Sequence, residues 1–89
     1  MNESYLEVTF RRGRPLVAYY YLPRGAKDKS HRTQRMEPGL VVDFRRGGEP
    51  IGIEILAPEK LTLAAFNGVL RSLGLPCVKR ADLAPLRAA

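Results

Sequence analysis

Residues 40–56, LVVDFRRGGEPIGIEIL, contain two short apolar runs separated by two arginines and two glycines. In each run every second side chain is large and apolar, which is the period of a β-strand with one buried face. If Gly47 and Gly48 form a two-residue turn, the two runs pair as an antiparallel hairpin. Six apolar side chains then share one face: Leu40, Val42, Phe44, Ile51, Ile53 and Ile55. The stretch therefore predicts a hairpin that packs one face on a core, and a four-residue turn over 45–48 would keep the faces but shift the partners.

Two acids lie on the other face of this predicted hairpin. Asp43 faces Gly52 and Glu54 faces Val41, so the two carboxyls are diagonal neighbours with Cβ atoms roughly 5–7 Å apart. That separation is loosely compatible with the paired carboxylates of a glycosidase. No other feature supports catalysis, because aromatic platforms are few and 89 residues leave little room to enclose a sugar. We expect the acids to offset nearby basic charge or to accept hydrogen bonds, and we predict no catalytic residue.

Three further strands are predicted before the hairpin. Residues 5–10 alternate between apolar and polar side chains, and residues 32–36 form a weaker strand. Residues 16–22, LVAYYYL, are apolar on both faces. A glycine-containing turn follows the first strand at 11–14, and a proline–glycine turn precedes the hairpin at 37–39.

An amphipathic helix is predicted after the sheet. Pro58 ends the last strand, and Thr62 is a good N-cap for a helix over 63–73. The apolar side chains of this segment are spaced three and four residues apart, as on one face of a helix: Leu63, Phe66, Leu70 and Leu73. Gly74 ends the helix, and Asp82 is expected to cap a short final turn.

Together these elements predict an α+β fold, a small antiparallel β-meander of about five strands covered by one C-terminal α-helix. We expect a single domain over 1–89. The sheet is expected at about 5–56, the helix at about 62–73, and a short turn and tail at 77–89.

One helix leaves one face of such a sheet uncovered. Whichever face the helix covers, the strand at 16–22 carries large side chains on the other face, because Leu16, Ala18, Tyr20 and Leu22 oppose Val17, Tyr19 and Tyr21. Exposed apolar surfaces usually mark association. The sequence therefore predicts a homodimer with Val17, Tyr19 and Tyr21 at its interface. The alternative is a pair of exposed tyrosines with nothing bound.

The chain is basic, with a net charge of +6 and a pI near 10.0. Most of the positive charge lies in the first half, and in a meander the loop at 23–31 and the turn at 45–48 lie at the same end of the sheet. This rim predicts a polyanion-binding surface that would take nucleic acid, formed by Arg24, Lys27, Lys29, Arg32, Arg45 and Arg46. The alternative is a solvated basic surface. The sequence has no helix-turn-helix, zinc-finger or RNA-binding signature, so sequence-specific readout is not predicted.

Other kinds of site find little support. His31 is the only histidine and has no neighbour at ligand spacing, so we predict no metal and no cofactor. Cys77 is the only cysteine, is expected to be partly buried, and fits a reducing cytoplasm because it has no internal disulfide partner. The sequence lacks a run of 18 apolar residues and a basic-then-apolar leader, so we expect no membrane span and no signal peptide. No small-molecule substrate is predicted.

Residues 39–58 resemble a small bacterial family catalogued as domain of unknown function 2283. That family's pattern is a glycine, a hydrophobic run ending in aspartate, a glycine turn and the sequence V-G-I-E-I-L. The matching residues here are Gly39, Asp43, Gly48, Gly52, Ile53, Glu54, Ile55 and Leu56. The resemblance extends over about 16–58, and this chain departs from the pattern in its basic Arg45 and Arg46 and in the helix beyond the core. The resemblance implies a compact sheet-rich fold and no activity, and some members look like antitoxin-style partners of small toxins.

These observations favour a small non-enzymatic interaction protein that dimerises in the cytoplasm. Three alternatives stay open from the sequence: a polyanion-binding module, an antitoxin-like partner of a small toxin, and a small hydrolase that uses Asp43 and Glu54.

Overall fold

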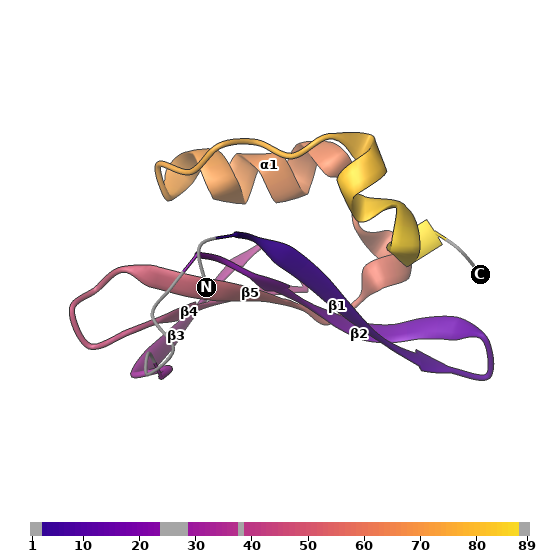
Figure 1. Cartoon of the computed structure of the whole chain (residues 1–89), viewed down its shortest axis with the longest axis horizontal. Helices are drawn as coiled ribbons and strands as arrows, with labels where there is room; N and C mark the ends of the chain where they lie inside the picture. The colour runs from indigo at the N-terminus through magenta and orange to yellow at the C-terminus, as the bar shows by residue number, and fades with distance from the viewer. Residues whose placement is uncertain (1–2, 24–28, 38, 88–89) are drawn as a thin grey trace.

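The computed structural model describes residues 3–23, 29–37 and 39–87. Its elements in chain order are β1 (Tyr5–Arg11), β2 (Arg14–Tyr21), β3 (Arg32–Glu37), β4 (Leu40–Phe44), β5 (Pro50–Ile55), η1 (Pro58–Lys60), α1 (Leu63–Ser72) and η2 (Arg80–Arg87). The strands form one antiparallel sheet, and the helical segments form a second layer on one of its faces (Figure 1). The predicted α+β fold with five antiparallel strands and one main helix is confirmed.

The strand order is β1-β2-β5-β4-β3, so the predicted meander is wrong. In a meander, the charged and largely exposed β3 would occupy the centre of the sheet and the apolar β5 an edge. In the structure β5 lies between β2 and β4, where Ile51, Ile53 and Ile55 are at most 1% exposed. This order places β5, which has four buried residues, in the middle and leaves polar β3 at an edge, where charged residues also discourage further strand pairing.

The β4–β5 hairpin pairs as predicted along most of its length, with Val42 opposite Ile53 and Asp43 opposite Gly52. Its turn differs, because both types of two-residue primed turn need a positive φ at the first central residue, Gly47, whereas in this turn only Gly48 takes a positive φ (+98°). The Gly48 N–H donates to the Arg45 carbonyl (2.8 Å), which closes a longer loop. Phe44 consequently pairs with Pro50 instead of Ile51.

The β1–β2 hairpin has the two-residue turn that its sequence favours. Arg12 (φ 53°) and Gly13 (φ 78°) both take the left-handed conformation, as a type I′ turn requires. A register shift between Thr9 and Phe10 leaves Leu16 without a partner across the pair. Leu16 is therefore 48% exposed and does not join Ala18 on the core face, contrary to the prediction. The tip of this hairpin projects beyond α1 (Figure 1).

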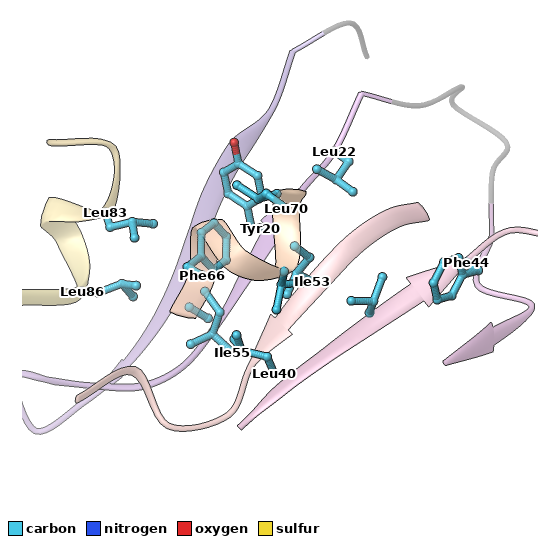
Figure 2. Packing of buried hydrophobic residues seen from close by; sticks show 13 residues of the cluster. Tyr20, Leu22, Leu40, Phe44, Ile53, Ile55, Phe66, Leu70, Leu83 and Leu86 are labelled. Atoms are coloured by element: carbon cyan, nitrogen blue, oxygen red, sulfur yellow. The ribbon is translucent and has the colours of Figure 1, made fainter. Parts of the chain in front are cut away.

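Helix α1 lies across the core face of the sheet. It begins after Thr62, whose Oγ1 accepts a hydrogen bond from the Ala65 N–H (3.1 Å). Phe66 is fully buried, and its ring meets that of Tyr20 edge-on with centroids 5.2 Å apart (Figure 2). The predicted helix is confirmed to within one residue at its end.

Helix α1 is not the last element, however, because η2 follows it and closes one side of the core. Leu83 and Leu86 of η2 are 4% and 5% exposed and point toward the buried side chains of the sheet and α1 (Figure 2). The Asp82 carboxylate accepts a hydrogen bond from the Lys79 N–H (2.8 Å). Asp82 thus helps to cap this segment, but from inside its first turn, because η2 begins at Arg80 and not after Asp82 as the sequence predicted. Within the described ranges, no helix is long and apolar enough to cross a membrane.

Candidate functional site

The sheet face opposite α1, here called the open face, has no described helix or strand against it (Figure 1). Its side chains form rows that cross all five strands. The pairing register gives a first row of Glu7, Tyr19, Glu54, Val41 and Arg35, and a second row of Tyr5, Tyr21, Gly52, Asp43 and Thr33. The open face therefore combines aromatic, acidic and basic groups in an ordered arrangement.

The three predicted interface residues all occupy this face. Tyr19 and Tyr21 lie in the two rows, and Val17 lies one step further along β2 with 37% of its surface exposed. Tyr5 and Leu56 are each 42% exposed. These side chains form the apolar part of the open face, and their role in association stays a prediction.

The tyrosines of the open face form one stacked cluster. The rings of Tyr5 and Tyr21 are parallel with centroids 4.4 Å apart, and Tyr19 meets Tyr21 edge-on at 4.6 Å. The Tyr21 hydroxyl donates to Glu7 Oε1 (3.0 Å). Aromatic pairs of this kind each contribute about 0.5–1.5 kcal/mol beyond the area that they bury. The ring contacts therefore hold the three tyrosines in fixed positions, and the hydrogen bond to Glu7 fixes the hydroxyl of Tyr21.

Tyr19 lies flat over Gly52 and reaches the carboxylate of Asp43. A Cβ atom built on Gly52 would overlap the Tyr19 ring and hydroxyl. The Tyr19 hydroxyl donates to Asp43 Oδ2 (2.7 Å), and Asp43 is only 7% exposed. Gly52 is thus required for the close approach of the ring, and the ring in turn covers the aspartate.

Asp43 and Glu54 interact as a pair of carboxyl groups. The pKa of Glu54 is raised by burial first, then by the charge of Asp43 and by a hydrogen bond with the Asp43 side chain. Asp43 Oδ1 is buried and accepts no hydrogen bond from any described donor while both acids are ionised. A protonated Glu54 could supply a donor to Asp43, so Glu54 retains its proton more readily than a separate carboxyl would.

Neither Asp43 nor Glu54 lines the hollows of about 360–400 Å³ that lie in the described part of the chain between the sheet and the helical layer. One of about 400 Å³ runs between the sheet and the segment after α1, where Leu6, Tyr20 and Leu75 line it. A hydrolase would need its two carboxylates accessible to one substrate, whereas Tyr19 shields Asp43 from solvent.

The basic rim is only partly defined, since Arg24 and Lys27 lie outside the described residues. Arg32 pairs with Phe44, which places the start of β3 at the same end of the sheet as the 45–48 turn, as strand direction required. The Arg32 guanidinium lies 4.1 Å from the centre of the Phe44 ring.

The remaining three cations of the predicted rim differ in their partners. Arg45 forms an ion pair with Glu49 (3.0 Å) across the turn. Lys29 and Arg46 are exposed. Two of the four described cations of the rim therefore already have partners within the chain, which weakens the rim as a phosphate-binding surface.

His31 and Cys77 do not join any cluster of ligands. Among the described residues there is no group of three or more His, Cys, Asp or Glu that could hold a metal. Cys77 is exposed, contrary to the expectation of partial burial, because the hydrogen bonds between Asn67 and the Val78 backbone turn Val78 inward instead. The Arg71 guanidinium donates to the Cys77 Sγ (3.3 Å).

The sequence did not indicate the part that Glu7 and Arg35 play in the open face. They are on strands far apart in the chain, and their alignment depends on the position of β5 between β2 and β4. Strand alternation alone would have placed Glu7 with Tyr5 and Arg35 with Thr33, but only the correct strand order shows that one row ends in an acid and a base.

No family model, curated protein or solved structure matches the chain. The resemblance of residues 39–58 to domain of unknown function 2283 consequently stays a prediction.

Proposed function

We propose that the protein is a non-enzymatic interaction module that forms a homodimer through the open face of its sheet. The observation that carries the proposal is the contrast between the two faces. One face is covered by α1 and η2 except near the tip of the β1–β2 hairpin, where Phe10 and Leu16 are each 48% exposed, whereas the open face leaves Tyr5, Val17 and Leu56 between 37% and 42% exposed. Several exposed apolar side chains on one face favour a binding site there.

The size of the open face is suited to moderate association. Five strands about 4.8 Å apart and about six residues long make a face of roughly 24 by 20 Å. Two such faces bury roughly 1,000 Å² before the relief of the side chains is counted, which is about the size at which specific interfaces begin. We expect a dimer that forms at micromolar concentration and not an inseparable one. The single cysteine is compatible with a cytoplasmic setting.

Sedimentation equilibrium of the purified chain at micromolar concentration tests the proposal. Val17→Lys introduces a charge into the open face and is expected to weaken the dimer at least tenfold, about 1.4 kcal/mol. Ala64→Lys is the matched control, because Ala64 is exposed on α1 in the opposite layer. A wild-type chain that stays monomeric, or equal effects of the two substitutions, would contradict the proposal.

The second candidate is a polyanion-binding surface at the basic rim. Lys29 and Arg46 are exposed at the end of the sheet where Arg32 begins β3, and this observation favours the candidate. Binding to labelled nucleic acid should weaken as salt is raised, and Arg46→Ala should reduce the salt slope by about one phosphate contact. Arg80→Ala is the control, since Arg80 is exposed at the start of η2. Absence of binding at low salt would remove this candidate.

A further inference from the structure

We infer that the two chains of the homodimer meet across a two-fold axis running along β5, which sets Glu7 of each chain opposite Arg35 of the partner subunit. This inference rests on the proposed dimerisation through the open face, and it specifies how the partner is oriented. The partner is a second copy of this chain, recognised by the charges at the two ends of one row.

The first row of the open face determines this orientation. Glu7 lies on β1 at one edge of the sheet, Arg35 lies on β3 at the other edge, and Glu54 lies midway between them. Each end is two strands from β5, or roughly 10 Å. A two-fold axis parallel to β5 exchanges the two edges, so the acid at one end of the row lies opposite the base at the other end.

The other two-fold arrangement is disfavoured by the same charges. An axis running along the row, across the strands, would set β1 over β1 and β3 over β3 of the partner. Glu7 would then face Glu7 of the partner subunit, and Arg35 would face Arg35 of the partner subunit. Like charges facing each other across an interface are costly. Both axes keep the strands of the two sheets nearly aligned, as sheets that pack face to face do within about 30°, so the charges decide in favour of the axis along β5.

Glu7 and Arg35 are both available for such a contact. Both side chains are exposed, and neither has an ion-pair partner among the described residues. Glu7 receives the Tyr21 hydroxyl on Oε1 only, which leaves Oε2 for a guanidinium. Arg35 is the one cation in the two rows of the open face.

The centre of the same interface contains Glu54. An axis along β5 brings Glu54 close to Glu54 of the partner subunit and sets Tyr19 opposite Val41 of the partner subunit. The groups around Glu54 within its own chain are Tyr19 on β2 and Asp43 on β4, with Glu7 and Arg35 further along the row. Two ionised glutamates would repel at this point. The raised pKa of Glu54 reduces that repulsion, because the protonated form is neutral.

Charge reversal followed by sedimentation velocity tests the orientation. Glu7→Arg and Arg35→Glu, made separately, are each expected to weaken the dimer at least tenfold, because each creates two like-charge contacts per dimer. The chain with both reversals should recover to within about threefold of the wild type, since the row again ends in one acid and one base. Glu59→Arg and Arg80→Glu, which change exposed charges in the helical layer, are matched controls and should have no effect.

A mixture of the two single variants checks that each is folded. Glu7→Arg chains should form heterodimers with Arg35→Glu chains, because both contacts of the mixed pair are then attractive. If the single variants weaken the dimer and the double variant does not recover, the orientation is overturned, but the proposed homodimer is not contradicted. Single variants that associate as tightly as the wild type would also overturn the orientation alone. A wild-type chain that is monomeric would remove the proposed function as well.

Discussion

Gly52 has no side chain, and the ring of Tyr19 occupies the space above it. The Tyr19 hydroxyl is the one described donor to the buried carboxylate of Asp43. A buried carboxylate that loses its donor costs about 1–3 kcal/mol. At the scale of single residues, the sequence correctly placed Asp43 opposite Gly52, but the hydrogen bond to Tyr19 depends on β2 lying beside β5, which the predicted meander excluded.

Gly52→Ala is therefore expected to displace Tyr19 and lower the free energy of unfolding by about 1–3 kcal/mol. Tyr19→Phe should cause a similar loss, because it removes the same hydrogen bond. The double variant should lose much less than the sum of the two effects, since both act on one interaction. Urea unfolding at a fixed chain concentration measures all three.

Gly68→Ala is the control for this prediction. A Cβ at Gly68 would meet no atom within 4 Å, and the residue lies within α1. It should therefore raise the free energy of unfolding by roughly 0.5–1 kcal/mol. A Gly52→Ala chain as stable as the wild type would show that the approach of Tyr19 to Gly52 does not contribute.

At the scale of elements, the sequence predicted each strand and the helix because their periods are local. The alternation in 40–44 and 51–55 specified which side chains meet the core, and Thr62 specified where α1 begins. The order of the strands was not predictable from the same evidence, since it depends on which strand buries most surface once all five are together. The sequence also left the form of the turn at 45–48 open between two and four residues, because two adjacent glycines allow several turn types and the choice follows from the whole hairpin.

The turn of the β1–β2 hairpin leads to a prediction at this scale. Arg12 takes a left-handed φ of 53°, which is unfavourable for a side chain other than glycine, asparagine or aspartate. Arg12→Asn gives the Asn-Gly pair that type I′ turns prefer, so it should raise the free energy of unfolding by about 0.5–1 kcal/mol. Arg14→Asn removes the same charge at a position with an ordinary φ and should give no gain. Thermal unfolding of the two variants separates the conformational effect from the effect of charge.

At the scale of the whole molecule, the two faces of the sheet differ in what covers them. The helical layer buries the apolar face of the sheet, and the acids of the open face have no such cover. The pKa of Glu54 is raised by its burial and by its neighbour Asp43. Any surface that covered the open face would bury Glu54 further and would therefore raise this pKa again. A group with a raised pKa contributes stability that is fully present below its unfolded pKa of about 4.5 and is lost as pH rises through its folded pKa.

The same sign applies to the proposed homodimer. Covering the open face buries Glu54 further and brings Glu54 of the partner subunit near it, so association raises its pKa again. A group whose pKa rises on association takes up protons, and the dimer should therefore strengthen as pH falls, by about tenfold for each unit by which the pKa rises in one chain. Glu54→Gln mimics the protonated form and should dimerise at about pH 7.5 as tightly as the wild type does at low pH, with little further response to pH. Sedimentation velocity between about pH 7.5 and pH 5.5 measures both chains, with Glu59→Gln as a control that keeps the wild-type response. A wild-type dimer that weakens as pH falls would contradict the placement of Glu54 at the centre of the interface.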